Sequence, residues 1–185
     1  MSTTRFSNRH GIASGVATIA LALLLGLAAG CGKTTETTTK GGGAVGTTAP
    51  AFALPDLEGH EVKDTDLRGK VVILDFWATW CGPCRLEVPH FVRLQSKYRD
   101  QGLQIVGLSM DAGGARDVRP FVDEHDVNYT MLIATDKTAQ DYGGILGIPT
   151  TFVIDRKGTI VKKFIGYTDP AVFEQTIQSL LAQSS

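Results

Sequence analysis

The sequence predicts an α/β domain in which helices cover both faces of a β-sheet. Residues 71–78 form a continuous apolar run, which is typical of a central strand buried on both faces. Apolar residues at helical spacing follow at 83–100, and a second apolar run lies at 104–110. Further along, the turn signal at 156–159 separates two more apolar runs and predicts a hairpin. Strands that alternate with helices in this way define the α/β class.

The remaining elements follow from the same spacing rules. The N-terminal part of the domain is predicted as a small hairpin that turns around Gly59, and the C-terminal part as an amphipathic helix. In chain order we expect two short strands within 52–63, a turn at 66–70, a strand at 71–78, a helix at 83–100, a strand at 104–110, a helix at 117–125, a strand at 129–133, a short helix at 138–142, a hairpin of 150–155 with 160–165, and a helix at 170–182.

The composition excludes several classes of protein. The chain has 185 residues, of which 43% are hydrophobic and 20% charged, so it is long enough for one domain with a substantial core. A net charge of −1 argues against a nucleic-acid partner, because such proteins are usually strongly basic. Three cysteines are too few for a small fold held together by disulfides. Only one uncharged run approaches the length of a membrane span, which excludes a polytopic membrane protein.

Residues 1–30 have the features of a secretion signal. Arg5 and Arg9 supply positive charge, and residues 11–32 contain no charged side chain. Small residues directly precede Cys31, as a signal peptidase requires. The run Leu27–Cys31 (Leu-Ala-Ala-Gly-Cys) resembles the lipobox of bacterial lipoproteins. This resemblance implies that Cys31 carries a lipid and becomes the first residue of the mature chain.

Two other interpretations of this segment stay open. Its 22 uncharged residues could remain as an uncleaved signal anchor, or the segment could be removed by ordinary secretion. All three interpretations place the protein outside the cytoplasm. Residues 31–49 are rich in Gly and Thr and are predicted to be the lipidated Cys31 with a flexible tether. The predicted folded domain is 50–185.

The strongest chemical signal is the motif Cys81-Gly-Pro-Cys84, which follows a buried strand and opens a helix. Two cysteines three residues apart on a first helical turn lie within disulfide reach. At the helix N-terminus, free N–H groups and the helix dipole stabilise a thiolate at Cys81, whereas Cys84 is one turn further in and shielded. Cys81 is therefore predicted to attack a substrate disulfide, and Cys84 to resolve the mixed disulfide.

A Cys-x-x-Cys pair could also be half of a zinc site, which needs two further ligands. Residues 50–185 contain no other Cys, and His60, His90 and His125 lie at no ligand spacing. We therefore predict no metal and no cofactor other than the redox-active disulfide Cys81–Cys84.

Several segments resemble those of one protein superfamily. Residues 75–84 (Asp-Phe-Trp-Ala-Thr-Trp-Cys-Gly-Pro-Cys) resemble the active site of thioredoxin, and 147–155 resemble the cis-proline segment of that superfamily. The stretches 49–59 and 67–72, together with Glu87, resemble the TlpA/ResA-like branch. The resemblance implies a thioredoxin-like fold, with a central mixed β-sheet, helices on both faces and an N-terminal β-hairpin extension. Members of this branch are membrane-tethered, extracytoplasmic thiol–disulfide oxidoreductases, and many act in cytochrome c maturation.

The resemblance also implies a substrate-binding surface. Pro149 is expected to follow a cis peptide bond and to pack opposite Cys81, which leaves the backbone of Ile148 free to pair with an extended substrate. Trp80 borders the reactive cysteine and is expected to form an exposed apolar docking rim. The predicted substrate-binding residues are Trp80, Gly82, Pro83, Ile148 and Pro149.

Two acidic residues are candidate proton carriers. Asp75 lies six residues before Cys81 in an otherwise apolar strand, where an unpaired carboxylate is costly. The thioredoxin-like interpretation makes it the proton acceptor for Cys84, and the alternative is a structural buried acid. Glu87, three residues after Cys84, matches an acidic position of the TlpA/ResA-like branch, and the alternative is plain solvation or helix-start electrostatics. Which acid dominates stays open.

These features predict a thiol–disulfide oxidoreductase that reduces or rearranges disulfides of partner proteins. The Gly82-Pro83 pair matches thioredoxin, a reductant with a potential of about −270 mV. A reductant outside the cytoplasm needs electrons, so a membrane electron-donor protein is an implied partner. Apocytochrome c is a candidate substrate, and we expect a monomer.

Two other functions share parts of this pattern. A peroxiredoxin-like thiol peroxidase shares the N-terminal pattern, but the Pro and Thr of its motif are replaced by Leu74 and Ala78. A copper-binding assembly factor of related fold uses Cys-x-x-x-Cys with a distant His, whereas this chain has Cys-x-x-Cys.

Overall fold

The computed structural model describes residues 42–183. The predicted signal segment, the lipid attachment at Cys31 and most of the predicted tether lie outside the described residues. Within residues 42–183, no helix is both long and apolar enough to cross a membrane.

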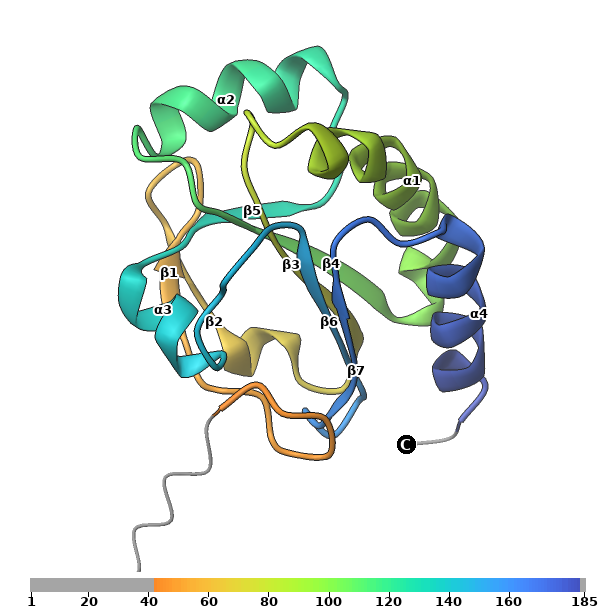
Figure 1. The fold of residues 1–185 in the computed structure, drawn as a ribbon. Helices are drawn as coiled ribbons and strands as arrows, with labels where there is room; N and C mark the ends of the chain where they lie inside the picture. Colours follow the sequence, from red (N-terminus) through yellow and green to blue (C-terminus); the bar gives the residue numbers. More distant parts are fainter. Residues whose placement is uncertain (1–41, 184–185) are drawn as a thin grey trace, which may run out of the picture. The chain divides into compact units, whose positions relative to one another are not determined.

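The centre of the described chain is a five-stranded sheet of order β5-β4-β3-β6-β7 (Figure 1). Strands β3, β4 and β5 run parallel to one another. Strand β6 pairs antiparallel with β3, and β7 pairs antiparallel with β6. The mixed sheet of the predicted fold is therefore confirmed. The strands are β3 (Val71–Trp77), β4 (Leu103–Ser109), β5 (Thr130–Ile133), β6 (Thr150–Ile154) and β7 (Ile160–Ile165).

Three helices pack on one face of this sheet. Alternate residues of β3 point to opposite faces, and Ile73 packs with Phe91 of α1 and Phe173 of α4. Trp77, on the same face, packs with Val118 of α2. The two right-handed crossovers that join β3, β4 and β5 explain why α1 and α2 share this face. The helices are α1 (Gly82–Tyr98), α2 (Ala115–Glu124) and α4 (Pro170–Leu181).

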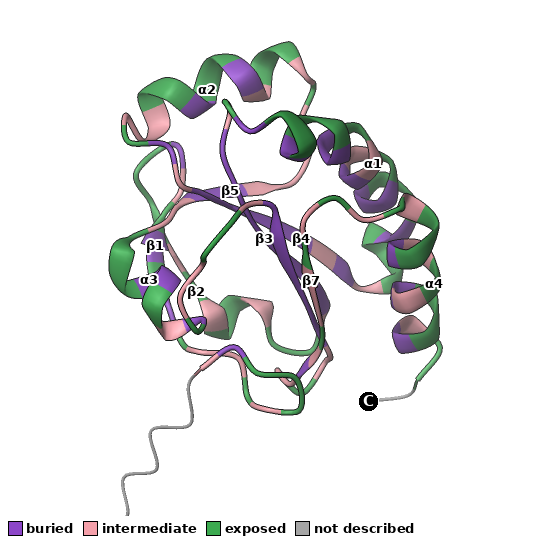
Figure 2. Ribbon diagram, viewed as in Figure 1, coloured by how far each residue is buried: buried purple, intermediate pink, exposed green. Residues whose placement is uncertain are grey.

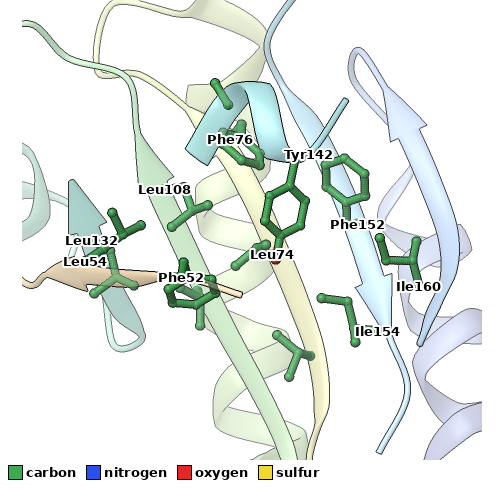
Figure 3. Close-up of a cluster of buried hydrophobic side chains, with 13 residues drawn as sticks. Phe52, Leu54, Leu74, Phe76, Leu108, Leu132, Tyr142, Phe152, Ile154 and Ile160 are labelled. Atoms are coloured by element: carbon green, nitrogen blue, oxygen red, sulfur yellow. The ribbon is translucent and has the colours of Figure 1, made fainter. Parts of the chain in front are cut away.

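The short helix α3 (Asp136–Asp141) and the N-terminal hairpin β1–β2 (Ala53–Pro55 and Glu61–Lys63) cover the other face. Tyr142 at the end of α3 packs against Phe76 and Phe152 of the sheet (Figure 3). Phe52 and Leu54 from the N-terminal segment close the same cluster. Every residue of β3 is buried, as its apolar run predicts (Figure 2).

The folded part begins earlier than the predicted boundary at Pro50. The amide of Gly46 donates to the carbonyl of Ile160 at 2.8 Å, and Thr48 bridges to Thr159. Residues 46–48 therefore extend the sheet beside the start of β7. Their Gly- and Thr-rich composition concealed this pairing, because backbone groups and not side chains make it.

Two further details differ from the expectation. The turn predicted at 66–70 begins earlier, as a 3-10 helix at Asp64–Leu67 whose Asp66 carboxylate accepts the amide of Lys63 at 2.9 Å. The long helix ends at Tyr98, and a 3-10 turn, Arg99–Gln101, leads into Gly102 with a φ of +96°. The other element boundaries lie within about three residues of those expected.

Candidate active site

The two cysteines lie at the junction between β3 and α1. Cys81 is the N-cap residue of α1, and Pro83 is in the first turn of the helix. A disulfide joins Cys81 to Cys84, with Cα atoms 5.2 Å apart. Cys81 is 5% exposed and Cys84 is 1% exposed, so the first cysteine is the more accessible of the two.

The sulfur of Cys81 has two polar neighbours. The amide of Cys84 lies 3.3 Å from the Cys81 Sγ, which is the geometry of a helix N-cap. The carbonyl oxygen of Ile148 lies 3.7 Å from the same sulfur, on the side away from the helix. When the disulfide opens, the free N–H groups of the first turn stabilise a thiolate at Cys81.

The segment before β6 faces this sulfur. The Ile148–Pro149 peptide bond is cis, as the resemblance implied. Pro149 is buried, and its carbonyl accepts the amide of Gly166 at 2.8 Å. The hydroxyl of Thr150 also fixes this segment, because it donates to the carbonyl of Gly147 at 2.7 Å. These bonds fix the segment beside Cys81, and the pairing of Ile148 with an extended substrate stays a prediction.

Asp75 lies in the middle of β3 and faces α1, since it alternates with Ile73 and Trp77. Its carboxylate accepts the hydroxyl of Thr151 at 2.9 Å. No ion pair to Asp75 occurs within residues 42–183, and its neighbour on β4 is Gly107. Burial raises the pKa of Asp75 to about 8, with a smaller contribution from the charge of Glu87.

Glu87 points into the same layer from α1, one turn after Cys84. It is 1% exposed, which contradicts the alternative of plain solvation. Its Oε1 accepts the amide of Thr168 at 2.8 Å, and its Oε2 is buried without a hydrogen-bond partner. Burial raises the pKa of Glu87 to about 7. The structure therefore brings both candidate proton carriers into the layer that holds Cys84.

The surface around the disulfide is apolar. Trp80 is 70% exposed, as expected for a docking rim, and Gly82 and Pro83 are exposed beside it. The sequence analysis did not single out the other exposed apolar side chains of this end. They are Leu86 on α1, Leu146 before the cis-proline, Ile165 at the end of β7 and Tyr167 after it. Their proximity to the two motifs could have indicated that they belong to the surface around the disulfide.

Asp111 was also missed. It follows β4 and is buried, and its carboxylate accepts the amide of Thr79 at 3.0 Å and the Thr79 hydroxyl at 2.6 Å. Ser109 donates to the same carboxylate at 2.9 Å. These bonds fix the loop that presents Cys81. A Ser-x-Asp at the carboxyl end of a buried strand, next to another strand that ends in a reactive motif, could have indicated this role.

Arg85 completes the support of the loop. Its guanidinium donates to the carbonyl of Thr79 at 3.2 Å and lies 4.9 Å from the centre of the Phe121 ring. Phe121 in turn packs against Trp77, with ring centres 5.0 Å apart. Both backbone polar groups of Thr79 are therefore bound by a charged side chain.

The site offers redox chemistry of sulfur. Across residues 42–183, no three His, Cys, Asp or Glu side chains gather as metal ligands. The sheet order, the N-terminal hairpin and a disulfide at a helix N-terminus opposite a cis-proline define a thiol–disulfide oxidoreductase of thioredoxin-like fold.

Comparison with known proteins gives the family. Residues 45–163 match the AhpC/TSA family, and the chain belongs to it. Over 138 residues it is 36% identical to the thiol-disulfide oxidoreductase ResA of Bacillus cereus, covering 74% of this chain and 78% of that protein.

Two crystal structures from Chlorobium tepidum share the fold. One, assigned as a thiol:disulfide interchange protein DsbE, has a TM-score of 0.70 and 38% identity over 75% of this chain and 99% of that one. The other, a thioredoxin family thiol:disulfide interchange protein, has a TM-score of 0.68 and 31% identity, with the same coverage. The recognition of the TlpA/ResA-like branch and of its enzyme class is confirmed.

Proposed function

We propose that this protein reduces disulfides of partner proteins outside the cytoplasm, held to a membrane by a lipid on Cys31. The observation that carries the proposal is the division between the two sulfurs. Cys81 faces the cis-proline segment with a helix N-terminus behind it, and Cys84 is enclosed with Asp75 and Glu87. The redox-active disulfide is the only cofactor that the reaction needs.

In the reduced protein, the thiolate of Cys81 attacks a sulfur of the substrate disulfide. The substrate's other sulfur leaves as a thiolate and takes a proton from solvent, and a mixed disulfide forms. The thiol of Cys84 then gives its proton to the carboxylate of Asp75 and attacks Cys81. The second substrate thiolate leaves, and the Cys81–Cys84 disulfide forms with two electrons passed to the substrate.

The proton on Asp75 then serves the return reaction. Because burial raises the pKa of Asp75 to about 8, its carboxyl is mainly protonated at neutral pH in the disulfide form. When an electron donor's thiolate opens the disulfide at Cys81, Cys84 leaves as a thiolate and recovers this proton. A buried acid without a cationic partner is suited to carry the proton in both directions.

The apolar end supports a polypeptide substrate. The exposed side chains Trp80 and Leu146 lie close to Cys81 and Pro149 along the chain, and Ile165 pairs with Thr150 directly after the cis-proline. The two charged residues of the first α1 turns are engaged with the protein itself, Arg85 with Thr79 and Glu87 with Thr168. An extended chain with apolar side chains on either side of its cysteine matches this surface.

Within this class of substrates we propose an apocytochrome c, with a membrane protein as electron donor. The relatives named ResA and the structural neighbour assigned as DsbE support an extracytoplasmic role. An oxidised peptide with the haem-attachment sequence Cys-x-x-Cys-His tests this substrate. We expect its reduction to be faster than that of a peptide with acidic residues around the same disulfide, and equal rates would contradict the proposal.

The direction of the reaction is tested by the reduction potential of Cys81–Cys84 in the full chain. A reductant is expected to have a value near or below about −250 mV, and a value near −120 mV would mark an oxidant. The anchor is tested separately, by incorporation of labelled fatty acid into the chain. Loss of the label in Cys31→Ser supports the lipid, and unchanged labelling contradicts it.

A further inference from the structure

The connection from β7 to α4 lies beside the cis-proline segment that faces Cys81. Ile165, the last residue of β7, pairs with Thr150 directly after the cis-proline. The next residue, Gly166, donates its amide to the carbonyl of Pro149 at 2.8 Å. This connection is therefore attached to the segment that is predicted to bind the substrate backbone.

A second hydrogen bond attaches the same connection to α1. The amide of Thr168 donates to Oε1 of Glu87 at 2.8 Å, and Glu87 is almost completely buried on α1. Tyr167 lies between the two attachments and is 49% exposed. Asp169 then caps α4 by accepting the amide of Ala171 at 2.8 Å. A single side chain of the helix that carries both cysteines thus fixes the loop that presents Tyr167.

We propose that Glu87 is a positioning residue for polypeptide substrates: through Thr168 it holds residues 166–169 against the cis-proline, so that Tyr167 and Ile165 face the substrate. This inference rests on the proposed function and assigns Glu87 a role other than proton transfer to Cys84. A hydrogen bond from a backbone amide to a buried charged acceptor is stronger than one between neutral groups. The carboxylate of Glu87 has such a bond to the loop through Oε1.

This role has a consequence that proton transfer does not share. A small disulfide reaches Cys81 without touching Tyr167, whereas an extended peptide passes along the loop. Loss of the Glu87–Thr168 bond should therefore lower the rate with peptides more than the rate with small disulfides. The ratio of the two values of kcat/KM isolates this effect from any change in the chemistry at sulfur.

The test uses the full chain, with glutathione disulfide and an oxidised peptide that has apolar residues around its disulfide. In Glu87→Leu we expect the ratio of kcat/KM, peptide over glutathione disulfide, to fall about tenfold. In Glu87→Gln, whose amide oxygen still accepts from Thr168, the ratio should stay within about twofold of the original. Tyr167→Ala should lower the ratio as Glu87→Leu does, and the double variant should fall no further. Val45→Ala, an exposed apolar truncation outside the site, is the matched control.

Hydrogen exchange at the Thr168 amide supplies a measurement independent of activity. Its protection should be lost in Glu87→Leu and kept in Glu87→Gln. Equal losses with both substrates in Glu87→Leu and in Glu87→Gln would overturn the proposal and identify Glu87 as a proton carrier. An unchanged ratio in Glu87→Leu, together with an unprotected Thr168 amide, would also overturn it. Failure of the original chain to reduce either disulfide would instead contradict the proposed function.

Discussion

The two ends of the central strand β3 are built in opposite ways. At its N-terminal end, the guanidinium of Arg156 donates to the carbonyls of Gly69 and Gln101 at 3.0 and 3.3 Å, and so ties the turns that precede β3 and β4. At its C-terminal end, Asp75 and Glu87 are buried without a cation. One end places a cation beside carbonyl acceptors, and the other buries two carboxyl groups without a cation beside them.

The difference separates stability from function. At the Arg156 end the two terminal nitrogens of the guanidinium bind carbonyl oxygens, and its buried Nε has no hydrogen-bond partner. The disulfide end has buried acids with raised pKa values, a buried Trp77 Nε1 without a hydrogen-bond partner and several exposed apolar side chains. Proteins break the rules of folding where the chemistry requires it, and here both buried acids and most of the large exposed apolar side chains of residues 42–183 lie at the disulfide end.

The largest effect is expected from Cys84→Ser. Without the second thiol, Cys81 still attacks a substrate disulfide, but the mixed disulfide cannot be resolved. We expect turnover to stop and the substrate to remain covalently bound to Cys81, as detected by mass spectrometry of the intact chain. Continued turnover in this variant would show that the two sulfurs do not divide the work as proposed.

The buried acids should make the oxidised protein lose stability as the pH rises. Burial raises the pKa values of Asp75 and Glu87 to about 8 and about 7, so the folded state binds more protons than the unfolded state above about pH 4. The free energy of unfolding should fall by on the order of several kcal/mol between pH 5 and pH 8.

Urea unfolding at the two pH values measures this loss. Asp75→Asn should remove the larger part of the pH dependence, because an amide does not titrate. A domain that is equally stable at both pH values would contradict the burial of ionisable carboxyls at this end.

Asp111→Ala tests whether the loop of the disulfide end depends on one carboxylate. It removes the acceptor of the Thr79 amide and hydroxyl, so the free energy of unfolding should drop by about 2 kcal/mol and attack by Cys81 should slow. Arg156→Ala is the control from the opposite end of β3. It should cost about 1–2 kcal/mol of stability and leave the reduction potential and the rate of attack unchanged.

Leu146→Ser should have the smallest effect on the fold. The side chain is fully exposed, so the stability should stay within about 0.5 kcal/mol. Loss of apolar contact with a peptide substrate should lower kcat/KM for that peptide about fivefold. Kinetics with peptide and glutathione disulfide distinguish a binding effect from a general one, and unchanged peptide kinetics would remove Leu146 from the docking surface.

The sequence predicted most of the fold, because its strands and helices have strong local patterns. The apolar run of β3, the helical spacing of α1 and the turn at Gly158 each determine one element with little help from the rest of the chain. The motif Cys81-Gly-Pro-Cys84 and the segment around Pro149 likewise located the two halves of the site, 65 residues apart when counted from Cys84 to Pro149.

The features that could not be predicted from the sequence are contacts between segments that lie far apart in the chain. The bonds of Asp111 to Thr79 and of Thr168 to Glu87 join residues 32 and 81 positions apart. No local pattern encodes such a pair. The pairing of residues 46–48 with β7 was hidden for the same reason, since backbone groups have no signature in the sequence.

The N-terminal segment enters the domain at the end of the sheet opposite the disulfide. Residues 46–48 join the sheet at the turn between β6 and β7, which lies at the N-terminal end of β3, and α4 likewise runs away from the disulfide end (Figure 1). The seven residues of β3 separate this end from Cys81 by roughly 23 Å. Residues 46–48 and Cys81 therefore lie at opposite ends of the sheet, so a partner can approach the reactive sulfur without meeting the segment through which the chain enters the domain.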